Sequence, residues 1–333
     1  MEYHLDLTVL TAGDVAGLLT YPEVVDAVEE TFRRSGKGLL FHPVKEPIWL
    51  DDAHTNMIKA MSAYLKDTGV AGIKWVSMMT HQKPGLPTCG GNLLILTDGS
   101  TGQPYALMEA SAITAMRTGG GHGVVAAKYL AKSGAATLAI VGCGEEGRAA
   151  AQSFLEQFPQ LTALRLCDRD PQAMAELARL YADRADVVCC ATPAQAAQGA
   201  DILVMATTSR TPLIHYEDLS PGCLVVGLYT FFDLDGACAA QADKWILGSW
   251  SQDTLQVLEN PGLKHYGLRK EDVAADLGEV ILGKKPGRES EREIIVYTHF
   301  GMDTMISRSD SRPGFFPRIT SPRSAATSSF RRP

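Results

Sequence analysis

Near the middle of the chain, six residues have the spacing of a loop that binds a dinucleotide. The pattern is G-x-G-x-x-G; it directly follows the apolar run 137–141 and directly precedes a helix-like stretch. In such loops the first glycine makes the tight turn, the second lets the backbone approach a pyrophosphate, and the third lets helix and strand pack closely. The pyrophosphate would lie at the helix N-terminus, where backbone N–H groups and the helix dipole favour an anion. The six residues are Gly142, Cys143, Gly144, Glu145, Glu146 and Gly147.

A carboxylate follows the loop at the distance that the pattern expects. Asp168 lies 21 residues beyond Gly147, where an acidic side chain would bind the hydroxyls of the adenosine ribose. This acid favours NAD, whereas the adjacent Arg169 suits the 2′-phosphate of NADP, so we predict NAD, with NADP as the alternative. The competing interpretation is a glycine turn that binds no nucleotide.

The residues around this loop alternate between strand-like and helix-like segments. Short apolar runs with little polar alternation fit parallel strands covered on both faces, and strands separated by helices indicate a doubly wound sheet. We therefore predict a Rossmann-type α/β domain over residues 120–302. Its expected strands are 137–142, 163–168, 186–192, 201–208, 223–228 and 244–248.

The first third of the chain mixes helix and strand signals. Apolar residues at helical spacing follow Pro22, and Gly36 and Gly38 suit the end of that helix. Segment 111–132 is expected to be a helix, a glycine-rich bend and a second helix. These signals predict a smaller α+β domain over residues 1–119. Its strand-like runs, which suggest a mostly antiparallel sheet, are 46–50, 56–61, 70–79, 92–98 and 104–110.

Composition narrows the class of protein. The formal net charge is −7, and the last 27 residues alone carry +5 from six Arg and one Asp, so the rest of the chain carries −12. An acidic body disfavours nucleic acid as a partner, because binding phosphates needs clustered Lys and Arg. No apolar stretch approaches the roughly 20 residues that span a bilayer, so no membrane association is expected.

Cysteine and histidine usage add two expectations. The seven cysteines include no C-x-x-C pair, and the N-terminus does not look like a signal peptide, which together favour a reducing cytoplasm. The eight histidines show no metal-ligand spacing, so no metal is expected.

With these motifs in view, the chain resembles the ornithine cyclodeaminase/mu-crystallin family from about residue 20 to about residue 305. The matching stretches include 72–76, 115–119 with the helix-like run after it, the glycine loop, and 199–209. The resemblance implies NAD(H) or NADP(H) as cofactor and an α-amino or α-imino acid as substrate. It also implies a homodimer formed through the N-terminal domain, which the C-terminal end, about 303–333, would complete. It adds Thr118, Ala206, Thr207 and Thr208 to the expected cofactor-binding residues.

An amino acid substrate presents a carboxylate, which fixed cations would anchor. Lys74 and Arg117 match the family positions for this role; the planar guanidinium can bind both oxygens, whereas the lysine acts as a point charge. Lys45 is the nearest match to a third cation, which is usually an arginine in the family. The change removes bidentate geometry and leaves the substrate class open.

Family members that cyclise ornithine use an aspartate after the fifth strand to handle protons. Here the region contains Tyr229, Asp233 and Asp235; Asp233 is our candidate, and Asp235 is expected to cap a helix. The predicted function is an NAD(P)-dependent amino-acid dehydrogenase or imine reductase. The alternatives are an ornithine cyclodeaminase and a non-catalytic NAD(P)H-binding protein.

The C-terminal end departs from the family, which normally continues into a helix. Residues 307–333 are rich in Ser, Arg and Pro and are expected to be disordered, either as an altered terminus or as a natural extension.

Overall fold

The structure is a computed structural model that describes residues 6–79, 92–228, 232–254 and 267–299. Within these residues the chain forms two compact units. The first comprises 6–20, 37–79 and 92–114, and the second comprises 21–36, 115–228, 232–254 and 267–299. The expected completion of the first domain by residues 303–333 and the predicted disordered tail lie outside the described residues, as do Cys89 and Tyr229.

The first unit is built on a mostly antiparallel sheet, as the strand-like runs indicated. In the described residues its order is β1-β7-β6-β5-β4-β2, with β3 paired to β4, and only β1 and β7 run parallel. Alternation along β4 and β5 buries Met61, Leu65 and Lys74 and leaves Trp75 exposed on the opposite face. The elements are β1 (Thr8–Leu10), α1 (Ala12–Ala16), β2 (Leu40–Phe41), β3 (Pro47–Trp49), β4 (Met57–Leu65), β5 (Val70–Met78), β6 (Leu93–Asp98) and β7 (Pro104–Glu109).

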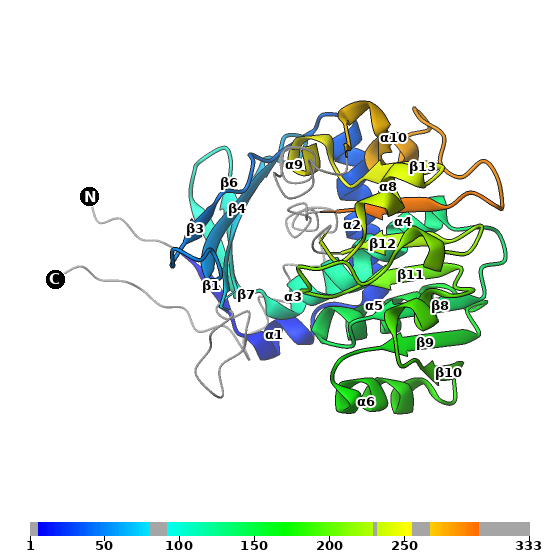
Figure 1. Ribbon diagram of the computed structural model, residues 1–333. Helices are drawn as coiled ribbons and strands as arrows, with labels where there is room; N and C mark the ends of the chain where they lie inside the picture. The colour runs from blue at the N-terminus through cyan, green and yellow to red at the C-terminus, as the bar shows by residue number, and fades with distance from the viewer. Residues whose placement is uncertain (1–5, 80–91, 229–231, 255–266, 300–333) are drawn as a thin grey trace, which may run out of the picture. The chain divides into compact units, whose positions relative to one another are not determined.

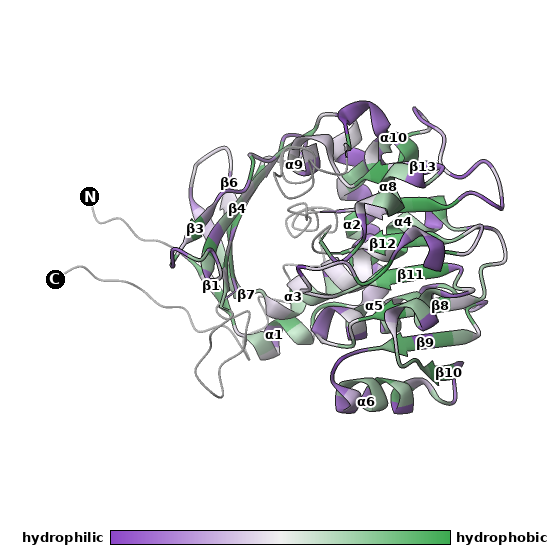
Figure 2. Cartoon of the chain, viewed as in Figure 1, coloured by the Kyte–Doolittle hydropathy of each residue, from purple (hydrophilic) through white to green (hydrophobic). Residues whose placement is uncertain are grey.

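The second unit contains the parallel sheet of a Rossmann-type fold. In the described residues, eight strands follow the order β10-β9-β8-β11-β12-β15-β13-β14, and β9, β8, β11 and β12 lie side by side in Figure 1. The central strands β8, β11 and β12 are buried and coloured as hydrophobic in Figure 2. The strands are β8 (Thr137–Val141), β9 (Ala163–Cys167), β10 (Asp186–Cys189), β11 (Ile202–Met205), β12 (Leu224–Gly227), β13 (Lys244–Leu247), β14 (Val273–Asp276) and β15 (Ile295–Thr298).

Helices separate most of these strands, and their starts follow from the sequence. Asp170 caps α6 by accepting a hydrogen bond from Gln172 N, and Pro171 occupies the first turn. The helical elements that precede the sheet or lie between its strands are α2 (Tyr21–Gly36), α3 (Ser111–Ala115), η1 (Met116–His122), α4 (Gly123–Leu130), α5 (Glu145–Gln157), α6 (Pro171–Tyr181), α7 (Pro193–Ala197), η2 (Tyr216–Asp218), α8 (Gly236–Gln241), α9 (Trp250–Asp253), η5 (Lys270–Asp272) and α10 (Leu277–Ile281).

All six strands predicted for this sheet are present, and the structure adds β14 and β15. The last strand in chain order, β15, inserts between β12 and β13, where Ile295 pairs with both Leu224 and Lys244. Its place depends on partners about 50 and 70 residues away in the chain, so local sequence patterns do not indicate it.

The predicted glycine-rich bend at 119–121 is wrong. Residues 116–122 form a π-helical turn, η1, that continues from α3 into α4 without leaving helical geometry. A Cβ on Gly119 would overlap the carbonyl oxygen of Glu146, and one on Gly121 would lie 2.7 Å from Val28 Cγ2. The glycines therefore serve close packing of η1 against α5 and α2 rather than a change of chain direction.

Helix α2 belongs to the second unit, whereas the sequence had placed it in the first domain. Its buried face carries Val25, Val28 and Phe32, and it packs against η1 and α10. A Cβ on Gly278 would lie 2.7 Å from Phe32 O, so the two helices approach at backbone contact. The boundary between the units also falls at residues 114/115 rather than 119/120.

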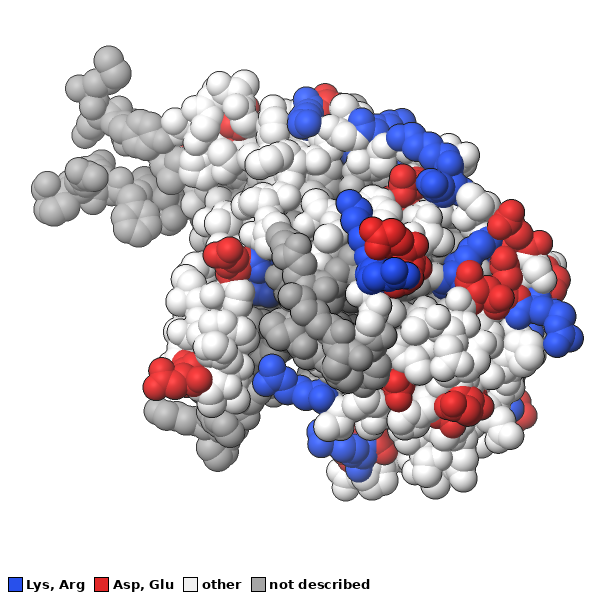
Figure 3. All heavy atoms as spheres, turned by 45° about the horizontal axis from the view of Figure 1, so that its top comes forward, with Lys and Arg blue, Asp and Glu red and all other residues white. Residues whose placement is uncertain are grey.

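Positively and negatively charged side chains lie on the surface. On the face that Figure 3 presents, some groups of Lys and Arg atoms lie next to Asp and Glu atoms, and other groups of either charge lie apart.

Candidate functional site

The three glycines of the loop have distinct environments. Gly142 follows β8 with φ of 99°, and a Cβ there would overlap the carbonyl oxygen of Ala206. A Cβ on Gly147, in the first turn of α5, would overlap the carbonyl oxygen of Gly142. At Gly144, in contrast, no atom of the described residues lies within 4 Å of an added Cβ, apart from those of the glycine and its two chain neighbours. The first and third glycines are therefore needed by the fold, and the second leaves open space above the loop.

The N-terminus of α5 lies at this open space. Gly144 is the N-cap residue and has no side chain to cap the helix. A 13-residue helix whose first turn faces open space suits an anion, because its dipole and N–H groups favour negative charge.

Asp168 accepts two backbone hydrogen bonds, one of them from the glycine loop. Cys143 N donates to its Oδ2 at 2.5 Å, and Asp170 N donates to its Oδ1 at 2.8 Å. The carboxylate is half-buried at the end of β9, while Arg169 is exposed. The predicted acid therefore lies beside the glycine loop, in the place where the pattern expects a ribose-binding group.

Two side chains of the loop region stabilise the protein itself. Glu146, predicted to bind cofactor, accepts a hydrogen bond from Gly119 N at 2.8 Å and so ties α5 to η1. Arg148, which the sequence analysis did not select, donates from Nε to Cys143 O at 3.2 Å and pairs with Glu176 at 2.8 Å. No sequence signal distinguished these roles, because both depend on partners brought together by folding.

The loop after β11 meets the candidate proton-handling residue. Thr207 donates a hydrogen bond from Oγ1 to Asp233 Oδ2 at 2.8 Å, and Asp233 is 1% exposed. Within the described residues the other oxygen, Oδ1, has no hydrogen-bond partner. Burial raises the pKa of Asp233 to about 7, despite the opposing effect of Thr207. Asp235 caps α8 through Ala237 N, as expected.

The remaining residues at this edge are Ala206 and Thr208. Ala206 N donates to Val141 O at 2.8 Å, so its backbone joins β11 to β8 beside the glycine loop. Thr208 is exposed.

The predicted substrate cations are buried. In the first unit Lys74 is 2% exposed and donates to Thr114 Oγ1 at 3.2 Å, and Lys45 is 4% exposed. In the second unit η1 carries Arg117, which is 6% exposed, and Thr118, whose hydroxyl has no hydrogen-bond partner among the described residues. Buried cations are uncommon in proteins, and a buried hydroxyl with no partner among the described residues suits a ligand.

The sequence analysis did not select one further cation, which lies near Lys74. Lys59 on β4 is half-buried, and burial lowers its pKa. The register pairs Met61 with Lys74, so Lys59 lies two residues away on the same face. Its place inside an apolar strand was the same signal that had drawn attention to Lys74.

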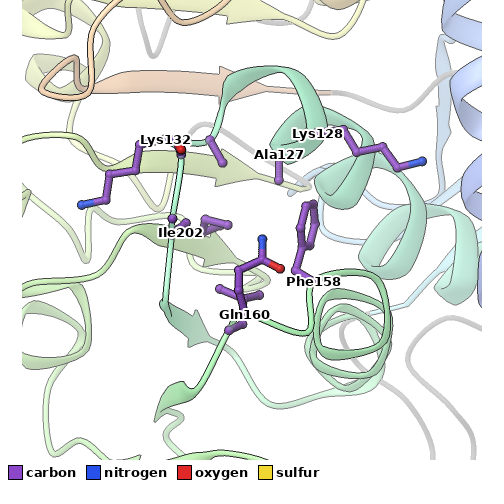
Figure 4. A pocket seen from close by; sticks show the side chains of 11 residues that line it. Ala127, Lys128, Lys132, Phe158, Gln160 and Ile202 are labelled. Atoms are coloured by element: carbon purple, nitrogen blue, oxygen red, sulfur yellow. The ribbon is translucent and has the colours of Figure 1, made fainter.

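A cavity at the amino-terminal edge of the parallel sheet is not a candidate for the cofactor or substrate site. Its volume is about 210 Å³, and in Figure 4 the ammonium groups of Lys128 and Lys132 point away from it. Lys132 pairs instead with Asp201 at 2.5 Å. Ligands of open α/β sheets bind at the carboxyl ends of the strands, the opposite edge.

The described residues show neither a metal-binding cluster nor a membrane-spanning helix. They include no group of three or more His, Cys, Asp or Glu side chains able to hold a metal ion. They also include no helix that is both long and apolar enough to cross a membrane.

The features of the second unit fit a dinucleotide. The open space at Gly144, the carboxylate of Asp168 at the end of β9 and the unpaired hydroxyl of Thr118 match the needs of a pyrophosphate-linked nucleotide. The fold and loop define a Rossmann-type protein of the dinucleotide-binding class.

Comparison with known proteins identifies the family. Residues 6–305 match the ornithine cyclodeaminase/mu-crystallin family, and the chain belongs to that family, as its motifs had indicated. An alanine dehydrogenase of Archaeoglobus fulgidus is 31% identical over 306 residues, which cover 90% of this chain and 91% of that protein.

Two solved structures share the fold over most of both chains. The Δ1-pyrroline-2-carboxylate reductase of Thermococcus litoralis, in complex with NADH and L-proline, is 26% identical with a TM-score of 0.81, covering 90% of this chain and 94% of its own. An archaeal alanine dehydrogenase dimer with bound NAD is 27% identical with a TM-score of 0.83, covering 95% of each chain.

Proposed function

We propose that this protein is an NAD(H)-dependent oxidoreductase that interconverts an α-amino acid and its α-imino acid. The observation that carries the proposal is a set of buried cations, Lys45, Lys74 and Arg117, in a chain whose second unit has a dinucleotide loop. Buried ammonium and guanidinium groups suit the carboxylate that every such substrate carries. Relatives with dehydrogenase and imine reductase activities support the same reaction class.

Different residues would have different roles in the reaction. NAD(H), when bound, supplies the hydride chemistry. The loop from Gly142 to Gly147 and Asp168 would hold its pyrophosphate and ribose, and Thr118 would contact it. Lys74 and Arg117 would hold the substrate carboxylate and so fix the orientation of Cα for hydride transfer.

Asp233 would handle the proton at the substrate nitrogen. Reduction of a neutral imine adds a hydride to Cα and a proton to nitrogen. With a pKa of about 7, the Asp233 carboxyl group can both give and take a proton near neutral pH. Thr207 would keep one oxygen oriented and leave Oδ1 for the substrate.

The carboxylate of Asp168 supports NAD over NADP. A fixed negative charge beside the loop would repel a 2′-phosphate, whereas it can accept hydrogen bonds from ribose hydroxyls. The exposed Arg169 is the feature that favours NADP.

The test has a binding part and a turnover part. NADH and NADPH are titrated into the full-length protein by energy transfer from Trp to nicotinamide, and we expect tighter binding of NADH. NADH oxidation is then followed with 2-oxo acids plus ammonia and with cyclic imines. Lys74→Met should lower kcat/KM by about 100-fold or more while NADH binding is unchanged. A chain that binds neither nucleotide, or a Lys74→Met variant as active as the parent, contradicts the proposal.

An ornithine cyclodeaminase is the second candidate, and the buried Asp233 favours it. That reaction would release ammonia from ornithine with no net change in NADH, so an ammonia assay separates the two functions. NADH binding without turnover of imines or ornithine would instead indicate a non-catalytic binding protein.

We propose that the first unit binds substrate and forms a homodimer. Large apolar side chains are exposed on the face of its sheet opposite Lys74: Phe41 at 58%, Ile48 at 56%, Trp75 at 42% and Leu93 at 42%. An apolar face of this kind marks an interaction site, and the archaeal alanine dehydrogenase is a dimer. We also propose a cytoplasmic location, which five buried free cysteines support.

A further inference from the structure

Lysines from neighbouring strands share one face of the first sheet. Across β4 and β5, Met61 pairs with Lys74 and Lys59 pairs with Val76. Lys59 and Lys74 are therefore diagonal neighbours, and diagonal pairs lie roughly 7–8 Å apart. Lys59 also pairs with Pro47 of β3, and the buried Lys45 lies two residues before that proline.

The described strands give this face little negative charge. Alternation from Lys74 assigns to it Leu94 and Leu96 of β6 and Met108 of β7. Within the described strands β1 to β7, Asp98 is the one carboxylate on this face, and it lies opposite Val70, four residues along β5 from Lys74. Its Oδ1 accepts hydrogen bonds from Ser100 N and Oγ, so this carboxylate stabilises the turn that follows β6.

Lys59 itself has no partner in the part of the chain that the structure describes, either as hydrogen bond or as ion pair. Burial alone lowers its pKa, and no neighbouring acid opposes that effect. Partial burial of the Lys59 side chain disfavours its charged form, and no anion among the described residues offsets this effect. A ligand carboxylate would supply the missing charge.

We propose that Lys59 binds a second carboxylate of the substrate, so that the enzyme acts on α-imino and α-amino acids that are dicarboxylic. This inference rests on the proposed function, in which Lys74 anchors the carboxylate next to the reacting carbon. The diagonal placement of Lys59 and Lys74 on one face lets two flexible lysine side chains reach two carboxylates that are separated by a short carbon chain. Lys59 is a specificity-determining residue and takes no part in hydride transfer.

The turnover test compares imines that share a reacting centre and differ in one carboxylate. Each of pyruvate, oxaloacetate and 2-oxoglutarate is mixed with ammonia, and NADH consumption is followed as hydride goes to Cα and a proton to nitrogen. We expect the parent protein to prefer a dicarboxylic imine. Lys59→Met should lower kcat/KM for that imine by about 30-fold and change kcat/KM for the pyruvate imine by less than about threefold.

The control is Lys37→Met, which removes the same charge from an exposed position of the same unit. It should leave both kcat/KM values unchanged. A parent protein that prefers the pyruvate imine, or a Lys59→Met variant that loses activity equally on both imines, overturns the inference. The proposed imine reduction survives either result.

A measurement of ligand binding tests the inference even if none of these imines is reduced. Calorimetric titration of the NADH-bound protein with succinate and with propionate compares a dicarboxylate with a monocarboxylate. We expect succinate to bind about tenfold more tightly or better, and Lys59→Met to remove the difference. Equal affinities in the parent protein overturn the inference, whereas absence of turnover alone counts against the proposed function.

Discussion

The pKa of Asp233 makes a prediction about stability that does not depend on knowing the substrate. Burial raises this pKa from 3.8 to about 7, so the native state binds the proton more tightly than the unfolded state. Its contribution to stability is therefore full below about pH 4 and is lost as pH rises to about 7. The whole difference corresponds to about 4 kcal/mol, of which about 2.5 kcal/mol falls between about pH 5 and pH 8.

The perturbation is Asp233→Asn, which keeps the shape of the side chain and removes its titration. Because all other groups titrate alike in both proteins, their effects cancel in the difference between variant and parent. We expect the free energy of unfolding of Asp233→Asn, relative to the parent, to rise by about 2.5 kcal/mol between about pH 5 and pH 8. Urea unfolding of the cofactor-free protein, followed by circular dichroism at both pH values, measures this quantity.

The exposed Asp183, changed to Asn, controls for the loss of one carboxylate charge. A difference between Asp233→Asn and the parent that is equal at the two pH values would contradict the raised pKa of Asp233. It would mean that Asp233 is hydrated or paired in the native state and that its pKa is near the ordinary value. The role of Asp233 as a proton carrier near neutral pH would fall with it.

Three further predictions follow from the geometry of the loop, the acid and the exposed sheet face. Gly144→Ala should leave thermal stability unchanged and weaken NADH binding about tenfold or more, because Gly144 has room for a Cβ. Gly147→Ala should destabilise the fold by about 2 kcal/mol or more, because Gly147 has no such room. Calorimetry and thermal unfolding of both variants check this, and equal effects of the two variants would contradict it. Asp168→Ala should raise the affinity for NADPH relative to NADH about tenfold, measured by paired titrations, and an unchanged ratio would show that Asp168 does not select the cofactor. In light scattering we expect the parent protein to be the proposed dimer and Trp75→Lys to be a monomer, whereas Leu180→Lys, at an exposed apolar position of the second unit, should stay a dimer. A monomeric parent protein would exclude the proposed interface.

The parts of the site that the sequence predicted are those set by neighbours in the chain. The roles of Gly142, Gly144 and Gly147 followed from their spacing between a strand and a helix, and the environments of the three glycines agree with them. The capping role of Asp235 was also local, since it needs only a backbone N–H two residues ahead.

Other features depended on partners far away in the chain. The glycines at 119–121 looked like a bend because glycine favours turns, but they serve contacts with α5 and α2. Glu146 stays a predicted cofactor-binding residue of the loop, but its side chain contacts Gly119, which the local sequence did not indicate. Helix α2 was assigned to the wrong unit because its apolar spacing predicts a buried face and not the surface that covers it.

The sequence alone was enough to indicate the class of fold and the family, and it predicted the dinucleotide loop with its acid. Each of these can be recognised from residues that are close together in the chain or from a motif with a set spacing. Tertiary structure alone decided that Asp233 is buried against Thr207 and titrates near neutral pH, and that Lys59 shares a face with Lys74. Burial and charge pairing depend on which distant segments meet, and local patterns carry no record of that.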